Sequence, residues 1–275
     1  MPKLAVSLAL LGLLLVPAAA SGAQQTASAG NVTASFSFSG QFPHFSNERL
    51  TISQSGTVLY DQAAVSRFCG SRCAPGSTSA QASSVHLVNL EGTSQLDVVL
   101  DLFTGGAHCC SVEQVFSFDP GTMTYVKTER NFGDPGARLV PDPARGGRVE
   151  FLTADDSFAY EFTDFAASGL PVQILSFANR RFHNVTRSFP SRVAADARRW
   201  MRAFRDMARD HYRDSVGVIA AWAADEDLLG HSRHVDRFLN AQARAGHLNA
   251  ATGQPGGKRF VANLHRFLRR HGYLR

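Results

Sequence analysis

The chain has 275 residues, of which 44% are hydrophobic and 19% are charged, and its formal net charge at pH 7 is +5. After the first 23 residues no apolar stretch approaches the roughly 20 residues that span a bilayer, which excludes a transmembrane segment in the mature chain. Up to Thr186 there are 11 Lys and Arg against 15 Asp and Glu, whereas residues 187–275 contain 17 against 8, so the basic excess lies in the C-terminal part.

The N-terminus has the pattern of a secretory signal peptide. Lys3 supplies a positive charge, Leu8 to Val16 form a short apolar core, and small residues offer cleavage after Ala20 or Ala23. An uncleaved membrane anchor is the alternative. We therefore expect an exported chain in which residues 24–30 are a polar linker that precedes the folded part.

Four cysteines lie in the first part of the chain, at Cys69, Cys73, Cys109 and Cys110. Export to an oxidising compartment favours disulfides, and four cysteines allow three pairings. Because a bond between the adjacent Cys109 and Cys110 would close only a small ring, we expect bonds between the two clusters. A metal site that includes His108 is the alternative, although the spacing is not a standard zinc signature.

Alternating apolar residues predict short strands up to Thr186. A strand–turn–strand pattern recurs over three stretches, at residues 34–60, 114–128 and 173–186. A matched nine-residue segment precedes the two later copies, at residues 89–97 and 142–150. Repeats of this kind are typical of propellers or stacked sheets, but two full copies and one partial copy are fewer than the ~4 blades of a closed propeller. We expect an antiparallel β domain of propeller-blade-like repeats in an open or partial arrangement.

These two nine-residue segments resemble the Asp-x-Asp-x-Asp-Gly-x-x-Asp loops of FG-GAP and VCBS-type repeats, in which oxygen ligands wrap a calcium ion. The resemblance covers roughly Val88 to Thr186. It implies weak calcium candidates in the first loop, at Asn89, Glu91, Thr93 and Asp97, whereas the second loop has Asp142, Ala144, Gly146 and Glu150 at the matching positions. The alternative is a surface turn closed by Gly92 and Ser94. We expect no tightly bound cofactor and little dependence on calcium.

Two further segments, Asp101–Cys110 and Asn131–Gly136, resemble segments of secreted actinobacterial proteins without an assigned activity, and this resemblance implies no catalytic residue. Nucleophile elbows, zinc-binding helices and phosphate loops are absent from the sequence. The residues that could carry acid–base chemistry are Asp101, His108, Asp155 and Asp156. A pocket that gathers them would favour a hydrolase, whereas separate, exposed positions would favour a binding protein. The alternative for the aspartates is a role in turns or salt bridges.

From Ser191 onward apolar residues recur at three- and four-residue steps, which predicts four amphipathic helices, the last three ending by Gly230, Gly246 and Gly272. The expected fold class is α+β. The expected organisation is a signal peptide at 1–23, a linker at 24–30, a disulfide-containing β domain at 31–186 and a basic helical domain at 187–275.

Clustered arginines suggest a surface for anionic partners. Aspartates interleave with the arginines of the first helix, including Arg198 and Arg199, which favours a solvated, self-paired face there. The last helix has no acidic residue, so we expect Arg266, Arg269 and Arg270 to bind anions. The sequence favours a secreted, non-catalytic binding or structural protein that contacts anionic envelope polymers or lipid headgroups, and it does not favour nucleic acid. A hydrolase acting on an envelope polymer is the alternative.

Overall fold

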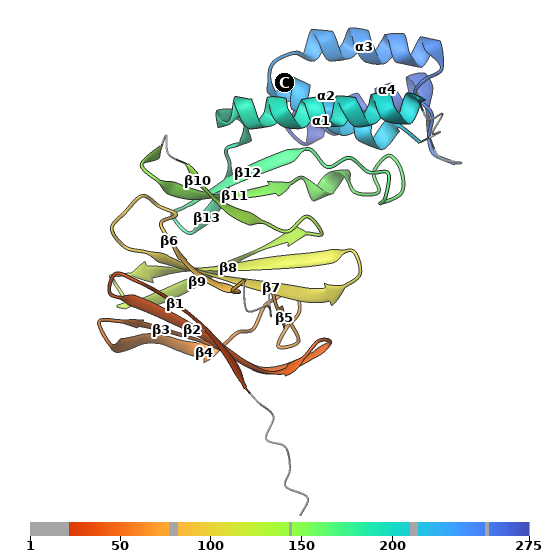
Figure 1. Cartoon of the computed structure of the whole chain (residues 1–275). Coiled ribbons are helices and arrows are strands. Elements are labelled where there is room, and N and C mark those ends of the chain that lie inside the picture. The colour runs from red at the N-terminus through yellow and green to blue at the C-terminus, as the bar shows by residue number, and fades with distance from the viewer. Residues whose placement is uncertain (1–21, 77–81, 143–144, 210–213, 251–252, 275) are drawn as a thin grey trace, which may run out of the picture.

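The computed structural model describes residues 22–76, 82–142, 145–209, 214–250 and 253–274. It contains three antiparallel sheets followed by four helices, so the α+β prediction is confirmed. The three sheets lie one above another in chain order, and the helices cover the last sheet (Figure 1). The predicted signal peptide falls almost wholly on residues 1–21, which lie outside the described residues.

The first sheet is a four-stranded meander whose neighbours pair in chain order: β1 (Ala23–Ala29), β2 (Val32–Gln41), β3 (His44–Gln54) and β4 (Thr57–Ala63). The sequence of β2 favours a strand with one buried face. Its buried residues alternate with partly exposed ones; they are Val32, Ala34, Phe36 and Phe38. The prediction of a linker at residues 24–30 is wrong. Most of it is strand β1, which pairs with β2 from Ala29↔Val32 to Ala23↔Phe38.

The second sheet is the middle layer, and both of its faces are buried. It contains β5 (Ala74–Pro75), β6 (Val85–Val88), β7 (Asp97–Gly106), β8 (Cys109–Asp119) and β9 (Thr124–Gly133), with β5 and β6 both paired to β7. Val98 and Phe116 pack into the core shared with the first sheet. Val99 and Val115 pack into a second core on the opposite face. This explains the continuous run of buried residues from Val112 to Ser117 in β8, which a sheet with one solvated face would not show.

The third sheet is again a four-stranded meander, formed by β10 (Arg138–Asp142), β11 (Arg148–Ala154), β12 (Val172–Ala178) and β13 (Arg181–Asn184). Phe151, Leu175 and Phe177 complete the core that it shares with the middle sheet. The three sheets therefore resemble blades stacked in an open array, as the repeat pattern predicts.

Four helices follow: α1 (Pro190–Arg209), α2 (Val216–Leu228), α3 (Ser232–Ala245) and α4 (Gly257–Arg270). Helix α2 is buried along nearly its whole length, and the other three are amphipathic and surround it. No helix within the described residues is long and apolar enough to cross a membrane.

The connection between β11 and β12 belongs to the helical core. Phe158 and Phe162 are buried in the same cluster as Phe260 and Phe267 of α4. The Thr163 hydroxyl group donates a hydrogen bond to the carboxylate of Asp214, which precedes α2. The predicted domain boundary at residue 187 therefore separates Phe158 and Phe162 in the sequence from the helices with which they share a core.

Candidate functional site

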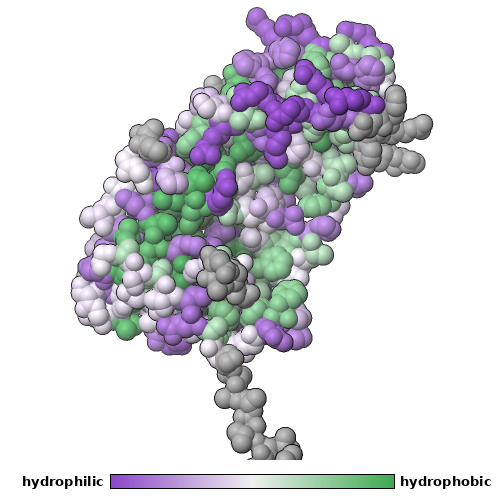
Figure 2. All heavy atoms as spheres, in the orientation of Figure 1, coloured by the Kyte–Doolittle hydropathy of each residue, from purple (hydrophilic) through white to green (hydrophobic). Residues whose placement is uncertain are grey.

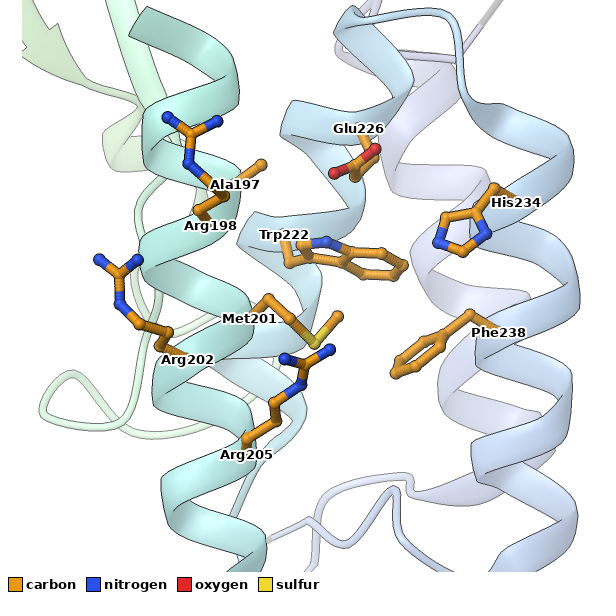
Figure 3. A pocket seen from close by; sticks show the side chains of 9 residues that line it. All are labelled: Ala197, Arg198, Met201, Arg202, Arg205, Trp222, Glu226, His234 and Phe238. Atoms are coloured by element: carbon orange, nitrogen blue, oxygen red, sulfur yellow. The ribbon is translucent and has the colours of Figure 1, made fainter.

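A groove between α1, α2 and α3 on the helical part has a cavity of about 580 Å³. Arg198, Arg202 and Arg205 line one wall because steps of four and three residues place them on one face of α1 (Figure 3). Trp222 of α2 and Phe238 of α3 line the other side of the groove, and Arg205 points toward them, whereas Arg198 and Arg202 extend away from them (Figure 3). The groove thus combines a basic wall with an aromatic wall.

The aromatic wall is held in place by packing. The Trp222 and Phe238 rings lie 4.8 Å apart between centroids, and the Trp222 and His234 rings lie 5.9 Å apart. Trp222 is only 2% exposed, so its ring is fixed by the core beneath it. Met201 fills the floor between the two walls (Figure 3). A ligand would therefore meet the partly exposed Phe238 and Met201, which are supported by the buried Trp222.

The three arginines of the basic wall have no ion pair within the described part of the chain, and all three are exposed. Their neighbour Arg199 differs, because its guanidinium group lies 2.6 Å from the Asp196 carboxylate and stacks 4.1 Å from the Trp200 ring. The single carboxylate of the groove, that of Glu226, lies 2.7 Å from Nδ1 of His231. Hydrophilic side chains gather over the helices in the space-filling view (Figure 2). The groove carries an excess of positive charge.

The expectation that aspartates neutralise the first helix is correct for only some of its arginines. Asp196 pairs with Arg199, and Asp206 lies 3.3 Å from Arg209. Asp214 is buried and accepts a hydrogen bond from Thr163 instead. Asp210, the remaining aspartate, lies outside the described residues. Arg198 therefore belongs to an unpaired stripe that the sequence pattern alone did not separate from Arg199.

The predicted arginines of α4 form a less concentrated surface. The Arg266 guanidinium group donates a hydrogen bond to Asn263 over 2.6 Å. Arg270 lies 3.8 Å from Glu161 and over the Phe267 ring, and Arg269 is exposed. These side chains are on the surface, as predicted, but one of the three has an acidic partner from the connection between β11 and β12.

Asp101 is part of a hydrogen-bonded group on the middle sheet. His86 Nε2 lies 3.0 Å from Asp101 Oδ2, and Glu113 lies directly opposite Asp101 on β8. Glu113 is 3% exposed, and burial, followed by the neighbouring Asp101 carboxylate, raises its pKa well above the usual range. The hydrogen bond to Asp101 raises the pKa of His86 despite its partial burial. His86 and Glu113 carry no motif that would have marked them in the sequence.

The other three acid–base candidates have different surroundings. His108 is exposed at the turn between β7 and β8, where its ring lies 4.4 Å from that of Phe165. Asp155 accepts a hydrogen bond from the Tyr273 hydroxyl group over 2.7 Å. Asp155 and Asp156 line a polar cavity that contains neither Asp101 nor His108. The four acid–base candidates therefore do not share this cavity.

The calcium candidates of the first loop already have donors from the protein. Asn89 Oδ1 accepts from the Gly92 amide over 2.6 Å, and Glu91 Oε1 accepts from the Asn179 amide over 2.7 Å. Asp97 is buried, and it accepts from the Ser117 hydroxyl group over 2.6 Å. Burial raises the pKa of Asp97 to about 6. The Arg148 guanidinium group donates to the Glu91 carbonyl oxygen, so a protein cation occupies this loop.

The second loop has a similar arrangement. Arg145 lies 3.6 Å from Asp142 and 3.9 Å from Glu150. Ala144 lies outside the described residues. Across the described residues, no three His, Cys, Asp or Glu side chains form a group that could hold a metal ion.

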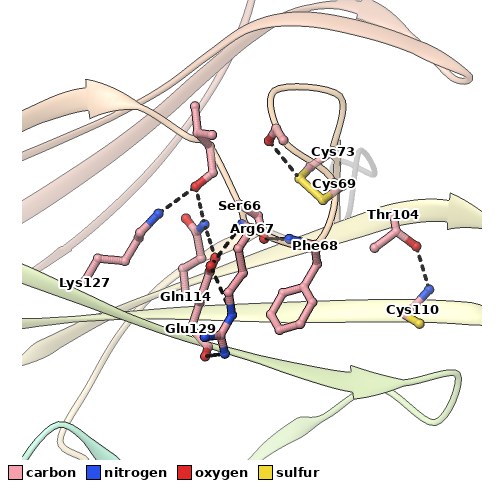
Figure 4. The surroundings of a disulfide bond; sticks show 12 residues. Ser66, Arg67, Phe68, Cys69, Cys73, Thr104, Cys110, Gln114, Lys127 and Glu129 are labelled. Carbon is pink, nitrogen blue, oxygen red and sulfur yellow. Dashed lines mark hydrogen bonds and ion pairs between the residues drawn. A yellow bond between two sulfur atoms is a disulfide. The ribbon is translucent and has the colours of Figure 1, made fainter.

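The cysteines pair within their clusters, which corrects the predicted bonds between clusters. Cys69 is bonded to Cys73 (Figure 4), and Cys109 is bonded to Cys110. A two-stranded bridge, in which Ser66 and Gly70 exchange backbone hydrogen bonds, folds the first segment back on itself. It brings the Cα atoms of Cys69 and Cys73 to 5.2 Å, within the usual disulfide range. Because Cys69 and Cys73 are bonded to each other, neither is available to form a disulfide with Cys109 or Cys110.

Comparisons with known proteins give two partial matches. The chain is 27% identical over 135 residues to a probable thylakoid lumen protein of Synechocystis, and 26% identical over 164 residues to an uncharacterized protein of Sinorhizobium fredii. The matched stretches cover 48% and 54% of this chain but only 40% and 24% of those relatives. No protein-family model and no solved structure matches the chain.

Proposed function

We propose that this chain is an exported, non-catalytic binding protein that holds anionic envelope polymers in the groove between α1, α2 and α3. The observation that carries the proposal is the stripe of Arg198, Arg202 and Arg205 on α1, unpaired in the described structure, along a groove that Trp222 and Phe238 also line. Guanidinium groups fork onto phosphate or carboxylate oxygens, and such hydrogen bonds are stronger than neutral ones. The unpaired arginines can contact the anionic groups of a polymer, and the apolar side chains beside them can contact the less polar part of the same polymer.

The spacing of the arginines supports a repeating ligand. Seven residues separate Arg198 from Arg205, which corresponds to about 10 Å along a helix, with Arg202 between them. A polymer that carries regularly spaced phosphates or carboxylates can contact several of these side chains at once. Binding through several weak contacts strengthens attachment without any one tight site.

Export is supported by two independent observations. Each of the four cysteines is in a disulfide, and disulfides persist in oxidising compartments outside the cytoplasm. One relative is named as a probable lumen protein, which places that relative in a non-cytoplasmic compartment. Together with the N-terminal pattern, these observations favour an extracytoplasmic role for this chain. The hydrolase alternative is less favoured because its four residues do not share a cavity.

The test compares two variants that each lose three positive charges. We expect the triple variant Arg198→Gln, Arg202→Gln, Arg205→Gln to bind a phosphate-rich wall polymer at least about tenfold more weakly than the unaltered chain, a change of about 1.4 kcal/mol. Exposed substitutions of this kind usually cost little stability, so the melting temperature should be preserved. Binding should also weaken at high salt, because the Debye length falls from about 10 Å at 0.1 M to 3 Å at 1 M.

The matched control is Arg266→Gln, Arg269→Gln, Arg270→Gln on α4, which removes the same charge outside the groove. We expect it to retain most of the binding, and a neutral polymer without sugar units, such as polyethylene glycol, should bind neither chain. Equal losses in the two triple variants would show that binding depends on overall charge, and a loss confined to the α4 variant would place the site on the last helix. Either result would overturn the groove proposal.

A further inference from the structure

A second cavity, of about 260 Å³, lies where β9, β11 and β12 approach the connection to the helices. It brings together two segments that are far apart in sequence: the end of β9 and the residues after β11. Its polar lining includes Arg130, Asn131, Asp155, Asp156, Ser157 and Gln173. The groove has three arginines against one carboxylate, whereas this cavity has one arginine and two aspartates, so it calls for a different ligand.

Local contacts fix the side chains around this cavity. Asp155 accepts hydrogen bonds from the Tyr273 hydroxyl group over 2.7 Å and from the Ser157 amide over 3.0 Å. Asn131 Oδ1 accepts from the Gly133 amide over 2.7 Å, which leaves the NH₂ group of Asn131 as a donor. Gly133 has a φ of +68°, and a Cβ atom there would overlap the Asp156 carboxylate. The cavity is therefore preformed rather than a gap between mobile side chains.

Two polar atoms at this cavity have unmet hydrogen-bonding capacity. Arg130 Nε and Ser157 Oγ are both buried, and neither has a hydrogen-bond partner in the described part of the chain. The Arg130 guanidinium group packs over the rings of Phe132 and Phe182, at 5.5 and 5.7 Å. A buried polar group without a partner costs about 1–3 kcal/mol. A ligand that supplies partners to these atoms would recover part of that cost.

The charge balance selects the class of ligand. Two carboxylates disfavour an anion, and the Arg130 guanidinium group disfavours a cation. We propose that the cavity binds a neutral, hydroxyl-rich saccharide unit. Arg130 and Asn131 donate hydrogen bonds to its hydroxyl oxygens, Asp156 accepts from its hydroxyl groups, and Gln173 can do either. This site is separate from the groove and does not depend on the function proposed for it.

The test uses the whole chain and simple sugars as probes. We expect glucose or N-acetylglucosamine to bind with millimolar or tighter affinity in calorimetry, and saturation-transfer NMR to show contact with the sugar ring. The variants Arg130→Gln and Asp156→Asn should each weaken binding at least about tenfold, because each leaves sugar hydroxyl groups without a charged partner. Their melting temperatures report whether the fold is retained.

Two controls match these changes in charge. Arg181→Gln alters an exposed arginine of β13, and Asp134→Asn alters an exposed aspartate next to the cavity that does not line it. Both should bind sugar as the unaltered chain does. The proposal is overturned if neither sugar binds, or if the cavity variants bind as well as the controls. It is also overturned if inorganic phosphate binds more tightly than sugar and Arg130→Gln abolishes that binding.

Discussion

Asp225 is the most strongly perturbed acid for which the structure gives a pKa value. It lies in α2 at 0% exposure, and neither carboxylate oxygen has a hydrogen-bond partner among the described residues. Burial raises its pKa to about 10, and the nearby negative charge of Asp196 adds to the shift. Asp196 itself accepts hydrogen bonds from Arg199, Trp200 and the Val172 amide. Asp225 is therefore protonated at neutral pH.

This assignment predicts how stability depends on pH. Below the ordinary pKa of 3.8 Asp225 is protonated in both the folded and the unfolded chain, whereas at higher pH only the folded chain keeps the proton. Folding then requires uptake of a proton, so the contribution of Asp225 to stability decreases from about pH 4 to about pH 10, by up to about 1.4 kcal/mol per pH unit. Asp225→Asn removes this dependence, and we expect the variant to be the more stable chain at pH 8.

Denaturant unfolding at several pH values between about 5 and 9 measures the difference. Asp206→Asn is the matched control, because Asp206 is exposed on α1 and its loss should leave the pH dependence unchanged. An Asp225→Asn chain that keeps the pH dependence of the unaltered chain would show that Asp225 is ionised in the fold.

Peptide mapping after proteolytic cleavage tests the disulfide pairing. Cleavage after Arg72 separates Cys69 from Cys73, and cleavage after Phe103 separates Cys73 from the two later cysteines. Without reducing agent we expect the peptides that contain Cys69 and Cys73 to remain joined, and the peptide with Cys109 and Cys110 to migrate alone. A link between the first and second clusters would contradict the structure. Loss of the Cys69–Cys73 bond should cost about 2 kcal/mol, as for other short loops.

At the scale of elements, the sequence predicts those strands and helices whose apolar residues recur at a regular short spacing. The alternation in β2 and the three- and four-residue steps of the helices follow from the side each residue presents to a core, so these elements were predictable. Helix α3 ends at Ala245 and Gly246 caps it with a φ of +75°, as the glycine pattern indicates. Strand β1 was missed because its Gln, Ser and Thr side chains lie on an edge strand, where only backbone pairing with β2 reveals it.

Sites that depend on contacts between distant elements could not be predicted in this way. The groove needs Arg198 from α1, Trp222 from α2 and Phe238 from α3, and no local period relates these residues. In the loop before β7, ligand-like spacing suggested calcium, whereas Arg148 from β11 and Asn179 after β12 satisfy its oxygens. A pattern can show that oxygens are available, but it cannot show which donor meets them.

The whole molecule is a series of layers in which each sheet shares a core with the next. The last sheet is joined to the helices by side chains from both parts. Arg187 donates hydrogen bonds to the Leu228, Gly272 and Tyr273 carbonyl oxygens near the ends of α2 and α4. Tyr273, two residues from the C-terminus, reaches back to Asp155 just after β11. The sheets and helices should therefore unfold together.

Two variants test this coupling. Phe158→Ala removes a ring that is 1% exposed and packs 4.8 Å from Phe267, so we expect a loss of about 3–5 kcal/mol. Trp200 and Trp222 both lie in helices, so their fluorescence reports the helical part, and amide exchange in β8 reports the sheets. If the parts are coupled, both signals shift to the same extent.

A chain that ends at Thr186 gives the stricter test, because it keeps the thirteen strands of the described residues and lacks α1 to α4. Phe158 and Phe162 would lose the helical core that buries them, and Asp155 would lose the Tyr273 hydroxyl group. Newly exposed aromatic side chains favour dye binding and self-association. We therefore expect this chain to bind a hydrophobic dye and to exchange its β8 amides faster than the full chain. Exchange at the rate of the full chain would instead show that the β domain is stable on its own.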